Sequence, residues 1–313
     1  MLVFYVVVSA LCFLSECYQL QEDSPICIKY SYIVECSGID NPDNLRKTYH
    51  KLLRSEICSK TEDVKLFQIV MSHFSYIPHD LLKGHDNIYS IDIRNTTLMS
   101  LSDTDTAFVG AEIWKLEMRH CVLFGDFDWN QLRNVTQLQE IVLIDIGLKY
   151  IDIDAKFPHS FNLKELTIKY NSISYISDQA FSEFVNLKNL QLSDNNISKL
   201  KRSMFPNLLS KIDLNSNKIS SLPSDLFTSM PNLKYLNLDR NGFQTLDQTL
   251  FAPIWKSLIW FNIEDNPLRC DCRIKWILLH PFPGEIFSGE CVEPNELKGR
   301  YLESLEHLEL SCF

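Results

Sequence analysis

The residues of this chain with the most constrained chemistry are its ten cysteines. Four of them stand near the C-terminal end, at Cys270, Cys272, Cys291 and Cys312. Cysteine thiolates can coordinate zinc, and cysteine thiols can oxidise to disulfides. Zinc clusters usually space their thiolates by about two to four residues, whereas Cys270 and Cys272 enclose only Asp271. The spacing therefore favours disulfide bonds over a metal site, and no metal is expected.

Residues for nucleophilic catalysis do not form a recognisable set. A catalytic serine or cysteine needs an adjacent base and a group that stabilises the oxyanion. The sequence contains no nucleophile-elbow motif, no helical pair of zinc-binding histidines and no phosphate-binding loop. His120 stands beside Cys121, but no third group completes a catalytic set, so a solvated histidine is expected. The sequence predicts a protein that is not an enzyme and needs no cofactor.

The first residues have the composition of a secretory leader. Residues 2–14 form an apolar run that is too short to span a bilayer, so residues 1–16 are predicted to be a signal peptide. No later segment is apolar enough for a membrane anchor. Three glycosylation sequons, at Asn95, Asn134 and Asn196, agree with export. We expect a secreted, extracellular glycoprotein.

The elements that must position these residues follow from a pattern that returns about every 24 residues from Val64 to Leu268. Each unit has an apolar first residue, apolar residues three, five, ten and thirteen positions later, and commonly Asn eight positions later. A unit of one strand, a turn and a return segment cannot close a core alone, so neighbouring units must stack. About nine strands are predicted, in units that begin at Val64, Ile88, Ile113, Leu138, Leu163, Leu187, Leu209, Leu233 and Leu258.

The recurring Asn is expected to be part of the scaffold. Its amide carries a donor and an acceptor that can satisfy backbone groups where the chain turns away from the sheet. Five units carry Asn171, Asn195, Asn217, Asn241 and Asn266 at this place, and the earlier units carry Ser72, Thr96, Cys121 and Ile146. Because Cys often replaces Asn in such repeats, Cys121 is expected to be a buried free thiol.

This pattern resembles extracellular leucine-rich repeat proteins over Val64 to Cys312, about four fifths of the chain. The resemblance implies an α/β solenoid with a curved parallel sheet on its concave face. Residues 17–63 would form an N-terminal cysteine-containing cap, residues 64–265 the repeat array and residues 266–313 a C-terminal flanking cap. Within this class, Cys36, Ser37, Gly38 and Ile39 and the weak early repeats look similar to arthropod proteins named after the non-catalytic subunit of Oplophorus-luciferin 2-monooxygenase. That similarity implies a companion protein that binds another secreted protein.

The predicted C-terminal cap resembles the flanking domain of extracellular leucine-rich repeat proteins. The resemblance implies that Cys270 pairs with Cys291 and that Cys272 pairs with Cys312. The family often has Trp where this chain has Leu268. The residues that carry the resemblance are Asn266, Pro267, Leu268, Arg269, Cys270, Asp271, Cys272, Trp276, Cys291, Pro294, Leu297, Gly299, Leu302, Leu305, Leu308 and Cys312.

The N-terminal cysteines leave their pairing open. If Cys121 is free, Cys27, Cys36 and Cys58 form an odd set unless signal cleavage leaves Cys17 on the mature chain. Cleavage before Cys17 is therefore favoured, with two bridges among these four residues. Three connectivities are then allowed, and the sequence does not choose among them.

Residues between the inward apolar positions should face solvent on the concave sheet, where solenoids commonly bind. Tyr235 and Trp260 stand one repeat apart in the same column and form a candidate aromatic anchor. Val142 and Ile144 form a candidate exposed hydrophobic spot. Lys169 and Asn237 complete the candidate partner-binding residues. The central column of this face should contain Asp92, Glu117, Val142, Thr167, Gln191, Asp213, Asn237 and Asn262, and a neighbouring column Arg94, Arg119, Ile144, Lys169 and Asn215.

Net charge and surface composition limit the class of partner. The formal charge of -10 and the pI near 5.3 argue against a nucleic-acid partner, which would require a basic stripe. Polar columns with isolated aromatics suit protein recognition. The sequence thus predicts a secreted, non-enzymatic scaffold that binds another extracellular protein through the concave sheet. A pattern-recognition protein for microbial glycans or lipids and a structural component of the extracellular matrix remain as alternatives. The oligomeric state is left open.

Overall fold

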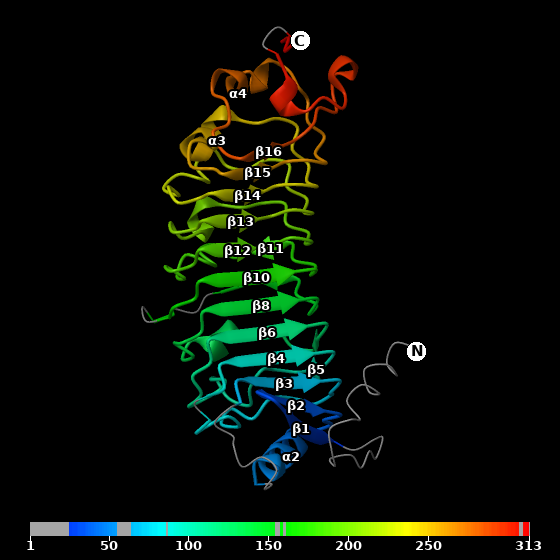
Figure 1. Ribbon diagram of the computed structural model, residues 1–313, viewed down its shortest axis with the longest axis vertical. Coiled ribbons are helices and arrows are strands. Elements are labelled where there is room, and N and C mark those ends of the chain that lie inside the picture. The colour runs from blue at the N-terminus through cyan, green and yellow to red at the C-terminus, as the bar shows by residue number, and fades with distance from the viewer. Residues whose placement is uncertain are drawn as a thin grey trace.

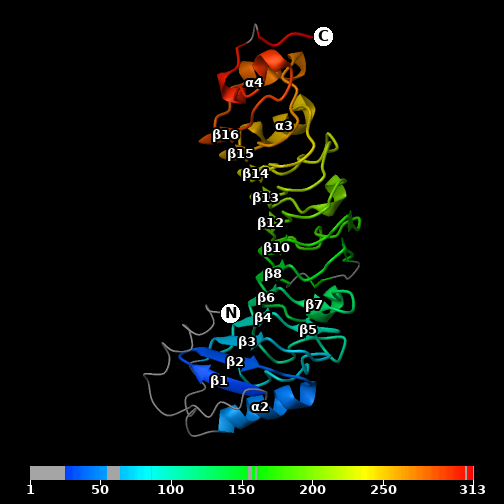
Figure 2. The same ribbon diagram turned by 90° about the vertical axis from the view of Figure 1, so that its right-hand side faces the viewer.

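The computed structural model describes residues 25–54, 64–85, 87–153, 157–158, 161–306 and 309–312. Over these residues the chain winds into one long coil (Figure 1), with strands on one side of the turns and return segments on the other (Figure 2). The strands form a main sheet of twelve members. The predicted curved parallel-sheet solenoid is confirmed.

The nine strands expected from the repeat pattern are all present in the main sheet. The sheet also extends past them at both ends, where it includes a hairpin before the repeats and one strand after them. Only the first pair, β1 and β2, is antiparallel. In spatial order, the strands are β1 (Ile26–Tyr30), β2 (Ile33–Ser37), β3 (Leu66–Val70), β4 (Ser90–Arg94), β6 (Lys115–Arg119), β8 (Glu140–Ile144), β10 (Glu165–Lys169), β12 (Asn189–Gln191), β13 (Lys211–Asp213), β14 (Tyr235–Asn237), β15 (Trp260–Asn262) and β16 (Ile286–Ser288).

Inward side chains of the strands build one continuous core. Leu166, Leu190, Ile212, Leu236 and Phe261 stand at the same register on β10, β12, β13, β14 and β15, and all five are buried. Burying one such side chain contributes about 1.5–3 kcal/mol. In a solenoid this stabilisation comes from the next turn, which explains why the pattern must repeat.

The recurring Asn residues form hydrogen bonds to the backbone of two adjacent turns, as predicted. Asn241 Nδ2 donates to the carbonyls of Leu214 at 2.9 Å and Leu238 at 3.1 Å, while Asn241 Oδ1 accepts from the Ile219 N–H at 3.0 Å. In an earlier turn, the Cys121 thiol donates to the Ile93 carbonyl at 3.3 Å. Since these groups satisfy buried backbone atoms, they are part of the scaffold.

A column of left-handed residues marks the edge where the chain leaves the sheet. Such a conformation is uncommon for residues other than Gly, and here it recurs at one place per turn because the chain must bend sharply after each strand. The values of φ lie between 44° and 57° at Met71, Asn95, His120, Asp145, Tyr170, Asp194, Ser216, Arg240 and Asp265.

The return segments are less regular than the strands. Phenylalanine rings of successive turns pack together here, with centroids 6.0 Å apart for Phe181 and Phe205 and 5.9 Å apart for Phe227 and Phe251. These contacts thicken the core behind the sheet. The elements on this side are β5 (Thr97–Leu98), β7 (Val122–Leu123), the 3-10 helix η3 (Trp129–Leu132), β9 (Tyr150–Ile151), β11 (Tyr175–Ile176), the 3-10 helix η4 (Arg202–Met204) and α3 (Gln248–Trp255).

A hairpin and a helix close the N-terminal end of the core. The disulfide Cys27–Cys36 joins opposite residues of β1 and β2. Helix α2 (Pro42–Arg54) lies across this end of the solenoid (Figure 2). It buries Leu45 and Tyr49, and the Tyr49 ring meets Phe67 of β3 with centroids 5.2 Å apart. These contacts cover apolar groups that a terminal repeat would otherwise expose.

Two disulfides and a tryptophan cluster close the C-terminal end. Cys270 is bonded to Cys291 and Cys272 to Cys312, which are the pairings implied by the family resemblance. Trp276 packs on Trp255 with ring centroids 4.6 Å apart and donates from Nε1 to the Leu246 carbonyl at 2.8 Å. The elements here are the 3-10 helix η5 (Cys272–Ile274), α4 (Trp276–Leu279), β16, and the 3-10 helices η6 (Asn295–Leu297) and η7 (Leu302–Ser304).

The remaining cysteines divide between a confirmed prediction and residues outside the described ranges. Cys121 is free and buried, as expected from its place in the repeat. The observed Cys27–Cys36 bond fits one of the three connectivities allowed by the sequence. The predicted signal peptide, Cys17 and Cys58 lie outside the described residues. Helices in the described ranges are all too short or too polar to cross a lipid bilayer.

Candidate binding surface on the concave sheet

The predicted central column of the concave face is present in the structure. Strand pairing brings Asp92, Glu117, Val142 and Thr167 into register on β4, β6, β8 and β10. It continues through Gln191, Asp213, Asn237 and Asn262 on β12 to β15. Figure 2 shows the strand layer bowed along the length of the molecule, so that its two ends project to the same side. The side chains of one column therefore line one curved surface.

The N-terminal part of this face is internally hydrogen bonded. Tyr30 donates from its hydroxyl to Glu35 at 3.0 Å and lies 3.2 Å from Gln68 Oε1. Gln68 Nε2 donates to Asp92 Oδ2 at 2.9 Å, and Arg94 Nη2 meets the same oxygen at 2.6 Å. Asp92 is buried, so its charge is balanced within the sheet face by its own neighbours.

The network continues across β6 and β8 around Glu117. Lys115 Nζ lies 3.1 Å from Glu117 and 2.8 Å from Glu140, and Arg119 also donates to Glu117. Burial acts to raise the pKa of Glu117, but the hydrogen bonds from Arg119 and Lys115 outweigh burial and hold the pKa below its usual value. These charged groups have partners within the chain, so this half of the face offers few unsatisfied groups to a partner.

The middle of the face corrects the prediction of an exposed hydrophobic spot. Val142 lies in the predicted column, between Glu117 and Thr167, yet it is only 5% exposed. The side chain of Val is short, and the neighbouring strands are close enough for longer side chains to cover it. Ile144 lies two residues further along β8 on the same face of the sheet, and it is half-buried. The prediction that Val142 projects into solvent was therefore wrong.

Lys169 is engaged in an ion pair rather than free. Its Nζ reaches over β12 to Asp213 Oδ2 on β13, at 3.2 Å. An ion pair of this partly exposed kind contributes only about 0–1 kcal/mol, so a partner could displace it at low cost. The pair nevertheless neutralises Asp213, the first carboxylate in the C-terminal part of the central column.

The C-terminal part of the face carries a row of large apolar side chains. Tyr235 of β14 and Trp260 of β15 are direct neighbours in the sheet register, as predicted, and Ile286 of β16 extends the row. Tyr235 is 42% exposed and Ile286 47% exposed. We call Tyr235, Trp260 and Ile286 the apolar row. The sequence did not indicate Ile286, because the pattern of apolar positions ends before β16.

Across the central column from the apolar row, at the other edge of the face, the chain presents hydrogen-bond acceptors. Asn215, Asp239 and Glu264 occupy the same place in three successive turns, since Ser216 N–H donates to the Asp239 carbonyl and Arg240 N–H to the Glu264 carbonyl. We call these three residues the acceptor column. Asn237, a predicted binding residue, uses its Oδ1 to accept from the Asp239 N–H at 3.3 Å.

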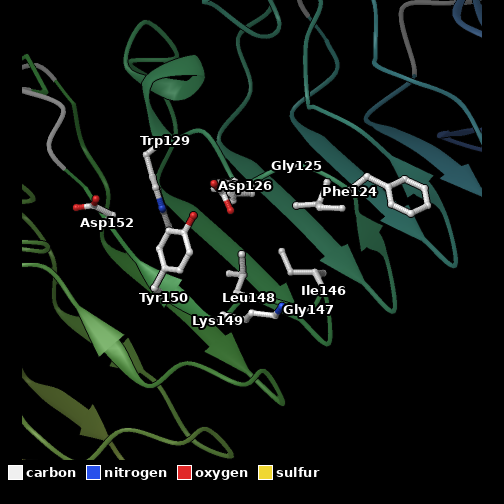
Figure 3. Close-up of a pocket in the computed structure, with 12 residues that line it drawn as sticks. Phe124, Gly125, Asp126, Trp129, Ile146, Gly147, Leu148, Lys149, Tyr150 and Asp152 are labelled. Carbon is white, nitrogen blue, oxygen red and sulfur yellow. The ribbon is translucent and has the colours of Figure 1, made fainter.

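A small hollow lies on the flank of the solenoid, between two return segments. It has a volume of about 160 Å³ and is lined in part by Phe124, Asp126, Trp129, Tyr150 and Asp152. Figure 3 shows the Tyr150 hydroxyl directed towards Asp126, with Phe124 standing apart at one end. A hydrogen bond to Asp126 raises the pKa of Tyr150. The irregular return segments gave no sequence signal for this hollow, which is small compared with typical ligand pockets of about 300–1,000 Å³.

The sequons and His120 lie at the surface. Asn95 and Asn134 are exposed and Asn196 is half-exposed. His120 is exposed and lies 2.9 Å from Asp145, as expected for a solvated histidine. Among the described residues, no group of three or more His, Cys, Asp and Glu side chains is arranged to hold a metal ion.

Comparison with known proteins supports the interpretation of the repeats. The leucine rich repeat family model matches residues 151–197, 161–210 and 207–268. Toll-like receptor 9 of Mus musculus is 32% identical over 146 residues, which are 44% of this chain but only 14% of that receptor. A chain in the solved octameric complex of Latrophilin 3, Unc5D and FLRT2 aligns with 80% of this chain and 91% of its own length, at 18% identity and a TM-score of 0.48. The family model thus matches residues 151–268, and the strands on both sides of this segment continue the same parallel sheet.

Proposed function

We propose that this chain is a secreted, glycosylated, non-catalytic scaffold that holds another extracellular protein against the C-terminal part of its concave face. The observation that supports the proposal most directly is the apolar row, which leaves Tyr235 and Ile286 partly exposed on a curved sheet. Aromatic side chains of this kind are common centres of protein interfaces, because they bury much area at a small entropic cost.

Three further features support export and binding outside the cell. Disulfides at both ends of the solenoid are typical of oxidising compartments. Asn95 and Asn134 are exposed, so glycosyltransferases can reach them. The predicted signal peptide would direct the chain to this route. The leucine-rich repeats are a scaffold on which binding sites are commonly built, although the fold alone does not specify a partner.

Site-specific photocrosslinking tests this proposal. We would place p-benzoylphenylalanine at Tyr235 in one sample and at Val185, an exposed residue on a return segment, in a control sample. Each sample would be irradiated in native extracellular fluid, and the adducts would be identified by mass spectrometry. The proposal expects a protein adduct at Tyr235 that is absent at Val185 and is lost in the W260A background. Equal labelling at both positions, or labelling that W260A leaves unchanged, would reject it.

The alternatives give different outcomes in parallel measurements. A pattern-recognition protein would bind immobilised microbial glycans or lipids while the Tyr235 sample yields no protein adduct. A matrix component would self-associate on a sizing column and yield adducts with its own chain.

A further inference from the structure

The concave face is electrostatically asymmetric along its length. Ion pairs in its N-terminal part join Arg94 to Asp92 at 2.6 Å and Lys115 to Glu117 at 3.1 Å. By contrast, β14 and β15 and the residues that follow them contribute no Lys or Arg at the corresponding positions, which are occupied by Tyr235, Asn237, Asp239, Trp260, Asn262 and Glu264. Acceptors therefore outnumber donors on this part of the face.

Asp239 is the more deeply buried of the two carboxylates in the acceptor column. It is 8% exposed, and its contact with Arg240 Nε is 3.8 Å long, beyond hydrogen-bond distance. Arg240 is drawn instead towards Asp265, at 3.2 Å. Burial raises the pKa of Asp239, Arg240 opposes the shift, and Asp265 and Glu264 reinforce it. An added cation would therefore be favourable here.

Asn215 is a second and independent indication that a donor is missing. Its Oδ1 atom is buried and has no hydrogen-bond partner among the residues that the structure describes. Buried polar atoms are nearly always hydrogen bonded, and leaving one without a partner costs about 1–3 kcal/mol. Asn215 precedes Asp239 by one turn in the acceptor column, so this unmet acceptor lies one turn away from the buried carboxylate.

We propose that the acceptor column binds a lysine or arginine side chain of a protein partner whose adjoining apolar groups rest on the apolar row. The inference rests on the proposed function, because it names the chemistry of the partner for the same face. Tyr235 and Asp239 are four residues apart along one turn, about 13 Å. That separation accommodates an extended segment with a basic side chain at one end and an apolar one at the other.

The geometry also favours a basic partner over an acidic one. The aromatic faces of Tyr235 and Trp260 attract cations, particularly the planar guanidinium group of arginine. Lys211 of β13 pairs with Tyr235 of β14 in the sheet register, so this basic residue lies next to the apolar row. It is four residues before Asn215 on its own turn and therefore at the opposite edge of the face from the acceptor column.

Peptide binding to the full-length oxidised protein tests the inference. The probe is fluorescent hexa-arginine, measured by polarisation beside a neutral glycine-serine peptide of equal length. Hexa-arginine should bind more tightly than the neutral peptide, and the difference should shrink between about 50 and about 300 mM salt. The double variant D239N/E264Q should weaken hexa-arginine binding by about five-fold or more.

The control removes the same two charges elsewhere. Asp105 and Glu112 are exposed residues away from the strands, and D105N/E112Q should bind hexa-arginine within about two-fold of the unmodified protein. Equal weakening in both double variants, or wild-type binding no tighter than that of the neutral peptide, would overturn the inference. Neither result affects the photocrosslinking at Tyr235, so the proposed function can stand if the basic partner does not.

Discussion

Asn215 and Asn217 lie two residues apart in one turn but have opposite hydrogen-bond environments. Asn217 Nδ2 donates to the carbonyls of Leu192 and Leu214, both at 3.0 Å, and its Oδ1 accepts from the Ile197 N–H at 3.0 Å. The Oδ1 of Asn215 is buried and accepts no hydrogen bond from any residue that the structure describes. One Asn thus holds adjacent turns together, whereas the other leaves a buried acceptor unused in the acceptor column.

This contrast predicts different stabilities for two chemically identical substitutions. Asn217→Ala should lower the free energy of unfolding by about 2 kcal/mol or more, because it leaves several buried backbone groups without partners. Asn215→Ala should change it by no more than about 0.5 kcal/mol. Urea unfolding followed by circular dichroism would compare the two midpoints. A loss for Asn215→Ala as large as that for Asn217→Ala would show that Asn215 has a structural partner.

The buried carboxylate of Glu117 should contribute stability that depends on pH. Its folded-state pKa lies below the ordinary value of 4.5 for a glutamate side chain, so its contribution is present above that value and is lost as the pH falls through the folded-state pKa. Glu117→Gln should cost about 2 kcal/mol at neutral pH, since hydrogen bonds to charged groups are lost. The cost should shrink as the pH falls through the folded-state pKa of Glu117, because the protonated glutamate is neutral like glutamine. Glu112→Gln, at an exposed position, is the control and should show no such pH-dependent difference.

Asp239 should behave in the opposite way. Its pKa is raised above the ordinary value of 3.8 for an aspartate side chain, so the folded state holds the proton more tightly than the unfolded state. Stability contributed by the protonated form is therefore lost as the pH rises through the folded-state pKa of Asp239. Asp239→Asn is expected to unfold at the same or a higher urea concentration than the wild type at pH 7. A clear loss of stability at pH 7 would mean that the Asp239 carboxylate is well compensated after all.

Cys121 should resist alkylation in the folded protein. Burial raises the pKa of its thiol to about 11, and the side chain is only 3% exposed. Because the thiolate is the reactive form, iodoacetamide near pH 8 should leave Cys121 unmodified until denaturant is added. Peptide mass spectrometry after timed quenching would measure the modified fraction. Rapid labelling in the absence of denaturant would indicate that this turn opens readily.

Disulfide pairing shows how far a sequence pattern extends into three dimensions. The pairing of Cys270 with Cys291 and of Cys272 with Cys312 was implied by the resemblance of the C-terminal cap to a known family. No comparable pattern existed for Cys27 and Cys36, and their pairing depends on a hairpin that sets them opposite one another. Strand register across a hairpin is a tertiary property, so the sequence left it open.

The repeat period was sufficient to predict the nine strands, the inward column of Leu and Ile, the Asn ladder and the adjacency of Tyr235 and Trp260. These features depend on spacing along the chain, because every turn of a solenoid places equivalent residues at the same height. Spacing along the chain did not predict which residues of the concave face are buried, ion-paired or without a hydrogen-bond donor. Val142 is buried, Lys169 reaches across β12 to Asp213, and Asn215 Oδ1 has no donor among the described residues. Burial and electrostatic compensation are sums over neighbours in space, and those neighbours are known only once the turns are stacked.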